Sequence, residues 1–303
     1  MKENLHLFSL VVKLGTGKIS PKAHKVKFTP SQIETGVENM ITSTANSKVK
    51  RLVNLQKKRK LRDEEHIFLV EGLRMFLEVP PQRLREIYVS EAFYAKEKGR
   101  IREVLGDRPV AFEVLSDHVY AFMSDTKTPQ GVLCVVKREE YTLQEMLCPP
   151  QEQPFLLVLD NLQDPGNLGT MMRAAEGAGV TGVILSRDCV DIYNPKTIRS
   201  TMGSIFRMPF YYAEDIVKET GRLHKAGIRI YAAHLDGDVS YEEAEYTGPT
   251  AFLIGNEGNG LRDEVAACAD TYVRIPMKGQ VESLNAAVAA SILMFEAARQ
   301  RRL

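Results

Sequence analysis

The chain has 303 residues, of which 44% are hydrophobic and 26% are charged, and its formal net charge is +1. This length is enough for two modest domains, and the composition is that of an ordinary globular protein. A net charge this close to zero excludes a chain that is basic overall, so any surface for nucleic acid has to be local.

The four cysteines and six histidines are scattered, and no CxxC pair occurs among them. This pattern argues against a disulfide framework or a zinc site, so we expect no metal and a reducing, cytoplasmic location. No apolar run approaches the roughly 20 residues that a membrane-spanning helix needs, so we expect no membrane partner.

Residues 1–40 lack the periodic pattern of the remaining chain. Residues 1–31 contain one acid, Glu3, and several lysines, which suits a transit peptide or an upstream extension equally. Organised pattern begins just after Met40, which is a plausible alternative start. We therefore expect residues 1–40 to be a weakly ordered N-terminal extension.

Residues 47–62 form a basic segment in which eight residues are Lys or Arg and none is acidic. Val49, Leu52, Val53 and Leu55 give it an apolar side, which predicts one helix. The ordinary interpretation of such a run is a solvated charged face, but the absence of acids favours a phosphate-binding surface. The RNA-binding candidates in it are Lys48, Lys50, Arg51, Lys57, Lys58, Arg59 and Lys60.

Strand and helix patterns alternate from His66 to Lys137. The expected strands are 67–70 and 86–90, the expected helices are 71–79 and 92–105, and further apolar runs occupy 112–115 and 131–136. We therefore expect a small α/β domain over residues 41–137. Residues 138–154 lose this pattern and contain three prolines, which indicates a linker and a domain boundary.

Residues 155–303 alternate again and form the second expected domain. The expected strands are 155–159, 183–186, 228–233, 251–255 and 272–276, with helices over 168–178 and from Ser283 onward. The first strand is apolar throughout, as a strand buried on both faces is. This alternation predicts an α/β fold with a parallel sheet and helices on both faces.

Three loops follow these strands, and ligands bind beyond the carboxyl ends of strands in open parallel sheets. In residues 159–175, Pro165 and Gly166 make a turn, Asn167 is suited to cap the next helix, and Arg173 falls on that helix's second turn. On its own, Arg173 is as easily an ordinary surface arginine.

The second loop, residues 254–261, has three glycines that let backbone approach a ligand, and Glu257 is its only charge. In the third, residues 275–289, Ser283 is suited to cap the final helix. Asn285 is a poor helix former, so we expect it to have another reason to be there. Taken alone, the second loop is as easily a plain tight turn, and a bare capping role is the ordinary interpretation of Ser283.

The segments NLQDPGNLGTMMRAAEGAG, LIGNEGNGL and VRIPMKGQVESLNAAVAASILMFEAARQ occur in this order and together resemble the SpoU/TrmH branch of the SPOUT RNA methyltransferases. The resemblance covers about residues 154–300. Residues 194–209 are also similar to the family's central pattern, except for Thr201 where the family usually has Ser. Residues 41–137 resemble, less closely, the family's small RNA-binding α/β/α domain.

The resemblance implies a C-terminal trefoil knot, a homodimer formed through the knot region, and a site built by both subunits. It also implies S-adenosylmethionine as cofactor, held largely by backbone. The matching cofactor positions are Gly255, Ile275 and Leu284, with Ile254 and Met277 beside them. In the central segment, Lys196 and Arg199 are further RNA-binding candidates.

The implied reaction is methyl transfer to a ribose 2′-hydroxyl of structured RNA, without a metal. The family's arginine is credited with activating the hydroxyl, but arginine rarely loses its proton, so we expect Arg173 to stabilise the developing alkoxide. Asn167 would orient Arg173 or the ribose, and Glu257 would pair with Arg173. Ser283 and Asn285 would shape the pocket. The group that takes the proton stays open.

We expect a guanosine of large-subunit ribosomal RNA as substrate, with transfer RNA as the alternative. A non-catalytic RNA-binding protein on the same fold would have lost some of the five candidate catalytic residues, and all five are present. A Rossmann dehydrogenase needs G-x-G-x-x-G after its first strand, which is absent here. A P-loop enzyme is excluded because Ile19 follows Gly15-Thr16-Gly17-Lys18.

Overall fold

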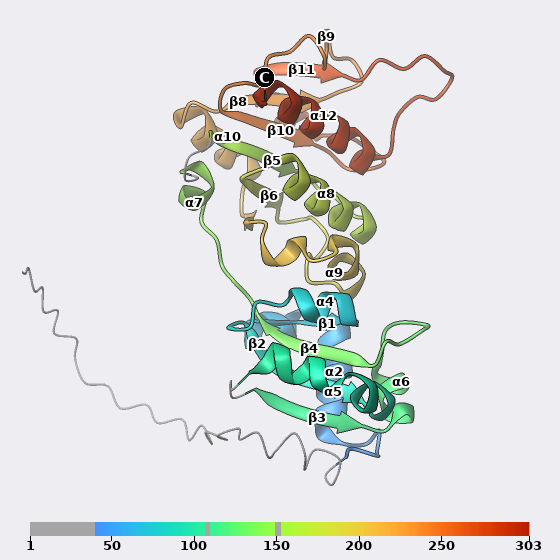
Figure 1. Cartoon of the computed structure of the whole chain (residues 1–303). Helices are drawn as coiled ribbons and strands as arrows, with labels where there is room; N and C mark the ends of the chain where they lie inside the picture. Colours follow the sequence, from blue (N-terminus) through green and yellow to red (C-terminus); the bar gives the residue numbers. More distant parts are fainter. Residues whose placement is uncertain (1–39, 107–109, 149–152, 303) are drawn as a thin grey trace, which may run out of the picture.

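The computed structural model describes residues 40–106, 110–148 and 153–302, and arranges them around a four-stranded and a seven-stranded sheet (Figure 1). The N-terminal extension expected over residues 1–40 lies outside the described residues except for Met40. None of the described helices is both long enough and apolar enough to cross a membrane.

The N-terminal unit is built on the four-stranded sheet, in the order β1-β4-β2-β3. Strand β4 is antiparallel to β1 and β2, whereas β2 and β3 are parallel. Its elements are α2 (Ser47–Lys57), α3 (Arg59–Glu65), β1 (Ile67–Glu71), α4 (Leu73–Glu78), β2 (Leu84–Ser90), α5 (Glu91–Leu105), β3 (Ala111–Leu115), α6 (Asp117–Met123) and β4 (Val132–Lys137).

The basic segment is two helices, so the prediction of one helix over 47–62 is wrong at Lys58. Lys58 has extended backbone angles (φ −114°, ψ 104°), which separate α2 from α3. The break is stabilised by Arg62, whose guanidinium donates to the carbonyl oxygens of Leu55 and Gln56 in the last turn of α2. A side chain thus replaces the hydrogen bonds that a continuous helix would have made.

The segment expected to be a linker contains helix α7 (Leu143–Leu147). A capping box begins it, in which Thr142 accepts from the Glu145 amide and Glu145 accepts from the Thr142 amide. Met146 is fully buried against Gly182, where a Cβ would lie only 2.4 Å from the methionine side chain. The helix is therefore packed onto the seven-stranded sheet.

The C-terminal unit is built on the seven-stranded sheet, whose strands are all parallel and follow the order β7-β6-β5-β10-β8-β11-β9. The α/β fold with a parallel sheet is confirmed, and the knot stays a prediction. Its elements are β5 (Phe155–Leu159), α8 (Pro165–Ala178), β6 (Gly182–Ser186), α9 (Pro195–Thr201), the 3-10 turn η1 (Ser204–Phe206), β7 (Phe210–Ala213), α10 (Ile216–Lys225), β8 (Arg229–Ala233), β9 (Val239–Ser240), β10 (Thr250–Ile254), α11 (Asp263–Ala266), β11 (Thr271–Arg274) and α12 (Ala286–Arg301).

Both faces of the central strands are covered. On β5, Phe155 and Leu157 join the cluster that contains α8 and α12, whereas Leu156 and Val158 join the cluster that contains α10 and α11. This alternation follows from the two-residue period of a strand. Helices α8 and α12 therefore lie side by side on one face of the sheet (Figure 1).

Helix α8 begins earlier than expected, at Pro165. Asp164 is its N-cap and accepts from the Asn167 amide at 2.8 Å, so the prediction that Asn167 caps this helix is wrong. Aspartate before a proline at the first helical position is a favoured start, because proline has no amide hydrogen to satisfy there. Arg173 consequently lies on the third turn of α8 rather than the second.

Helix α12 begins later than expected, at Ala286. Asn285 is its N-cap and accepts from the amides of Ala287 (2.9 Å) and Val288 (3.3 Å). The prediction that Ser283 caps this helix is therefore wrong. The expectation that Asn285 has a reason of its own to be there is correct, because a side-chain amide oxygen satisfies amide hydrogens that the helix leaves free.

Candidate active site

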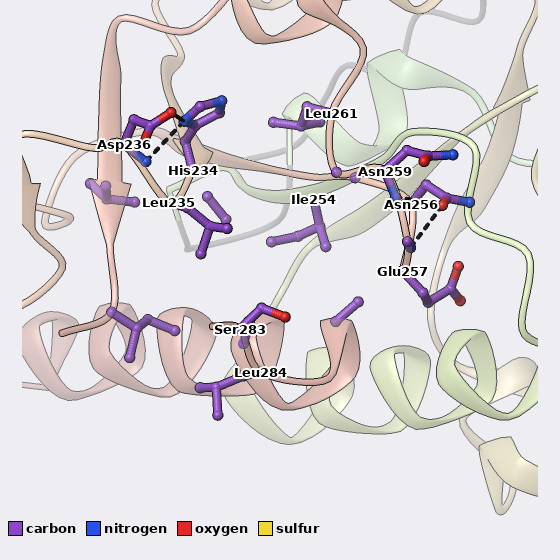
Figure 2. A pocket seen from close by; sticks show the side chains of 18 of the residues that line it. His234, Leu235, Asp236, Ile254, Asn256, Glu257, Asn259, Leu261, Ser283 and Leu284 are labelled. Carbon is purple, nitrogen blue, oxygen red and sulfur yellow. Dashed lines mark hydrogen bonds and ion pairs between the residues drawn. The ribbon is translucent and has the colours of Figure 1, made fainter. Parts of the chain in front are cut away.

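A pocket of about 340 Å³ lies at the carboxyl ends of β8, β10 and β11 (Figure 2). This is the edge at which open parallel sheets bind ligands, and the volume falls within the range of about 300–1,000 Å³ that is usual for small-molecule sites. The pocket is lined by residues 233–236 and 254–261, and by Val273, Ile275, Met277, Ser283, Leu284, Ala286 and Ala289.

All five residues expected to contact the cofactor line this pocket, namely Ile254, Gly255, Ile275, Met277 and Leu284. Of the catalytic candidates, Glu257 and Ser283 line it as well. Residues 233–236, at the end of β8 and in the turn that follows it, were not among the residues predicted from the sequence. The sequence contained a signal for them, because they follow the strand expected over 228–233 just as the loops 254–261 and 275–289 follow theirs.

The pocket has polar ends and an apolar middle (Figure 2). At one end the Asp236 amide donates to Nδ1 of His234, whose ring stacks on Tyr272 with centroids 5.0 Å apart. At the other end Oδ1 of Asn256 accepts from the amides of Gly258 and Asn259. An elongated ligand with an apolar centre and hydrogen-bonding ends suits this arrangement.

Gly255 allows the second loop to fold back on itself. A Cβ at this position would lie 2.1 Å from the carbonyl carbon of Gly260 and 2.2 Å from the amide nitrogen of Leu261. The turn is closed by hydrogen bonds in both directions between Asn256 and Gly260. Only glycine lets the backbone pass this closely, so the shape of the pocket wall depends on it.

A buried carboxylate anchors the far end of the same loop. Asp160, which follows β5, is fully buried and accepts from Nε of Arg262 at 3.1 Å and from the Arg262 amide at 3.2 Å. Asn256 also donates to the Asn161 carbonyl at 2.8 Å. The first and second loops are therefore held together at two points on the sheet edge. Asp160 was not among the candidate residues.

Glu257, Asn167 and Asn285 join all three loops through side chains. Glu257 accepts from the amides of Gln163 (3.1 Å) and Asp164 (2.9 Å) and from Nδ2 of Asn167 (3.0 Å). Oδ1 of Asn167 in turn accepts from Nδ2 of Asn285 at 3.0 Å. Residues from three distant segments thus meet at one place, as the sequence analysis expected.

These hydrogen bonds also determine the charge state of Glu257. Burial alone would raise the pKa of its carboxyl, but the bonds from the Asn167 side chain and from two backbone amides lower it, and the pKa ends below its usual value. The carboxylate of Glu257 therefore favours its anionic form, in which it accepts hydrogen bonds from loop amides at the pocket edge.

Comparison with known proteins identifies this architecture. Residues 154–295 match the SpoU rRNA Methylase family, and residues 46–134 match the MRM3-like substrate binding domain. The chain is 33% identical to a 23S rRNA (guanosine(2553)-2′-O)-methyltransferase, RlmP of Bacillus subtilis, over 84% of this chain and 97% of the relative. The chain belongs to the SpoU rRNA methylase family.

Solved structures agree with this membership. An AdoMet-bound rRNA methyltransferase from Sinorhizobium meliloti has a TM-score of 0.75 and 31% identity, covering 86% of this chain and 97% of the other. An RNA 2′-O ribose methyltransferase has a TM-score of 0.74 and 33% identity, covering 87% and 100%. The family resemblance read from the three loops is therefore confirmed.

Arg173 of this SpoU family member lies outside the pocket. Its side chain is exposed on α8, and it makes no hydrogen bond or ion pair with any described residue. The expected pair with Glu257 is absent, because Glu257 accepts from Asn167 and two amides instead. Within the part of the chain that the structure describes, no group of three or more His, Cys, Asp or Glu is placed to hold a metal.

Most of the RNA-binding candidates of this family member are already paired with carboxylates. The pairs are Lys48–Glu113, Arg51 with Glu65 and Glu86, Arg59–Asp63, Lys60–Glu64, Lys196–Asp164 and Arg199–Asp125. Lys50, Lys57 and Lys58 are exposed and form no ion pair with a described residue. Cations without a partner attract phosphate most directly, so these three are the strongest candidates.

Proposed function

We propose that this chain transfers a methyl group from S-adenosylmethionine to a ribose 2′-hydroxyl of large-subunit ribosomal RNA, at a guanosine. The observation that carries the proposal is the meeting of three loops at one pocket, tied by Glu257, Asn167 and Asn285. The names of the relatives support the substrate, since RlmP of Bacillus subtilis and RlmB of Escherichia coli (30% identical) are both 23S rRNA guanosine 2′-O-methyltransferases.

The pocket fits the cofactor. Gly255 leaves no space for a side chain, so backbone atoms form that wall, and the apolar side chains of Ile254 and Leu284 lie between the polar ends (Figure 2). A flat adenine needs such an apolar slot, and the ribose and amino-acid ends need hydrogen-bonding groups. When bound, S-adenosylmethionine supplies an activated methyl group that needs no metal for transfer.

The chain's own residues would position the ribose and stabilise charge. A hydroxyl is a poor nucleophile, so placement in line with the methyl group supplies much of the rate. Asn167 and Asn285 hold the pocket edge where the ribose would lie. Arg173 stays protonated and would stabilise the alkoxide that develops on the 2′-oxygen, or hold a neighbouring phosphate.

A homodimer would complete this site. Gly177 on α8 faces Phe295 of α12. A Cβ added to this glycine would lie 3.5 Å from the phenylalanine ring. Arg173 lies one helical turn before Gly177 and hence on the same face of α8. Val288 and Phe295, seven residues apart on α12, are 48% and 45% exposed. A second copy packed on this face would cover the two apolar side chains and include Arg173 in the interface.

We place the enzyme in the cytoplasm, where ribosomal RNA is available and thiols stay reduced. All four cysteines are unpaired, which suits that compartment. Lys50, Lys57 and Lys58 would bind RNA phosphates on the N-terminal unit, and Lys196 and Arg199 would do so near the site by exchanging a carboxylate for a phosphate.

The decisive experiment is transfer of labelled methyl groups to RNA isolated from a strain that lacks this gene, followed by mass-spectrometric mapping of the methylated nucleotide. We expect one 2′-O-methylguanosine in large-subunit ribosomal RNA. Labelling confined to transfer RNA would refute the proposed substrate. Failure to bind S-adenosylmethionine at millimolar concentration in calorimetry would refute the activity itself. Sedimentation equilibrium tests the dimer, and a monomer at micromolar concentration would refute it.

A further inference from the structure

The two units share a packed surface. The ring centroid of Phe68, on β1, lies 4.8 Å from that of Tyr193 and 6.1 Å from that of Phe206. All three side chains are buried and belong to one continuous hydrophobic cluster that includes residues of both sheets. Units joined only by a linker reorient freely, whereas a shared apolar core holds them in one orientation.

Among the residues that the structure describes, three ion pairs cross this surface, and the pair between Arg62 and Asp191 is the most buried of them. Its side chains are only 4% and 13% exposed. The others, Arg199–Asp125 and Arg207–Glu78, are each more than a third exposed. Loss of one partner of a buried pair leaves the other charge uncompensated, so Arg62 and Asp191 hold the surface together more strongly than the exposed pairs do.

Arg62 also holds the last turn of α2, in the middle of the basic segment. The same guanidinium that pairs with Asp191 donates to the carbonyl oxygens of Leu55 and Gln56 in the last turn of α2. Lys57 and Lys58 follow directly. One side chain therefore holds the backbone that carries these two lysines in place relative to the seven-stranded unit.

Asp191 belongs to a loop that is bonded to the pocket edge. The neighbouring Val190 amide donates to the Leu162 carbonyl at 2.8 Å, and Nε2 of Gln163 donates to the Asp188 carbonyl at 2.8 Å. The Gln163 amide in turn donates to Glu257. Fixed contacts therefore extend from the two lysines, through Arg62 and Asp191, to the edge of the cofactor pocket.

We propose that Arg62 and Asp191 are positioning residues that hold Lys57 and Lys58 at a set distance from the methyl-transfer site. The enzyme thereby selects folded RNA in which a backbone phosphate lies at that distance from the target ribose. The inference rests on the proposed function. Arg62 and Asp191 act through the two lysines and the pocket edge, and contact neither the cofactor nor the reacting ribose.

Asp191→Asn is the sharpest test. Asparagine keeps the Oδ1 that accepts from the Tyr193 amide at 2.9 Å, so the local turn survives, but the charge that faces Arg62 is lost. We expect the KM for a full-length unmethylated 23S rRNA transcript to rise about tenfold, because the competent orientation becomes a minor one. We expect kcat and the calorimetric Kd for S-adenosylmethionine to stay within about twofold, because the pocket itself is unchanged.

Glu214→Gln is the matched control. It removes the pair between Arg187 and Glu214, whose side chains are 72% and 80% exposed and which has no hydrogen bond or ion pair to a described residue of the four-stranded unit. We expect no change in KM, kcat or Kd. If Asp191→Asn does not fold, Glu78→Gln removes a more exposed pair on the same surface, and we expect about a threefold rise in KM from it.

Three results separate this inference from the proposed function. A wild-type enzyme without activity on this transcript overturns both. An active wild-type enzyme whose KM is unchanged in Asp191→Asn and in Glu78→Gln overturns the positioning role alone. A rise in KM that comes with an equal loss of cofactor affinity also overturns it, because general destabilisation would act on both.

Discussion

Replacement of Gly255 by alanine should weaken S-adenosylmethionine binding. The new Cβ would meet the backbone of Gly260 and Leu261 at 2.1–2.4 Å, whereas ordinary contact begins at 3.4 Å. Backbone cannot rotate away as a side chain can, so the turn over residues 256–260 has to retreat by about 1 Å. That turn forms one wall of the cofactor pocket.

The size of the effect follows from this displacement. Overpacking that forces a backbone shift costs about 1–3 kcal/mol. If the displaced wall loses that much of its interaction with the cofactor, the Kd rises about 5- to 150-fold. Isothermal titration calorimetry on folded protein measures the Kd directly, and circular dichroism verifies that the variant has kept its secondary structure.

The chain contains two matched controls. A Cβ at Gly258, in the same loop, would lie 3.5 Å from Oδ1 of Asn256, and a Cβ at Gly279 would have no atom within 4 Å. Alanine at either position should leave the Kd within about twofold of the wild-type value, because neither side chain displaces backbone. If all three variants bind the cofactor equally well, close backbone approach at Gly255 does not shape the pocket.

Three further predictions concern catalysis, charge and RNA binding. Arg173→Ala should lower kcat by about 10²–10³-fold and leave the cofactor Kd unchanged, because Arg173 lies outside the pocket; full activity would remove it from the mechanism. Glu257→Gln should lower the free energy of unfolding at pH 7 by about 1 kcal/mol, since glutamine keeps one acceptor oxygen for the Asp164 amide and Asn167 but loses the charge and the acceptor of the Gln163 amide at an exposed position. The pKa of Glu257 is lowered in the folded state, so its contribution is present above the unfolded-state value and lost as pH falls through the folded one. Denaturant titrations of variant and wild type should therefore converge on acidification, and a constant difference would contradict this account. Replacing Lys57 and Lys58 together by alanine should reduce the slope of log affinity against log salt by about 1.5–2, and an unchanged slope would make the segment a solvated face.

The parallel sheet was predictable because each of its central strands is a continuous apolar run. In strands β5, β6 and β10, every residue is buried. A short, continuous apolar run is typical of a strand that is buried on both faces of a parallel sheet. The loops that follow such strands have to lie at the carboxyl edge of the sheet. The loops at this edge could therefore be located from pattern alone, whereas Ile254, Gly255 and Ile275 were assigned to the cofactor by the family resemblance.

The helix starts were less predictable because several polar residues competed for each cap. Asn167 and Ser283 are both good caps by residue type, yet Asp164 and Asn285 hold those positions. At α8 the proline that follows Asp164 was a usable signal. At α12 no local signal shows which residue is the N-cap. Asn285 is held in that position by its bond to Asn167, 118 residues earlier in the chain.

Long-range contacts account for the remaining differences. The order that places β10 between β5 and β8 has no local signature. The break at Lys58 depends on Arg62, which is held in place by Asp191, 129 residues away. The bonds of Glu257 to the first loop have no local signature either, and charge alone suggested a pair with Arg173 instead. Local pattern located the loops, the family resemblance assigned roles to their residues, and tertiary contacts determined the partners of those residues.

Arg173 and the cofactor pocket lie on two different surfaces of the chain. Asn167 belongs to the hydrogen-bond network at the start of α8, and Arg173 lies six residues later, about 9 Å further along the helix axis. A single chain can therefore build the cofactor pocket without presenting its arginine to it. The same face of α8 and α12 carries the exposed apolar side chains of Val288 and Phe295. Because association would bury those side chains and enclose Arg173 at once, the burial that stabilises a dimer would also give the arginine the low-dielectric surroundings in which its charge stabilises an alkoxide most strongly.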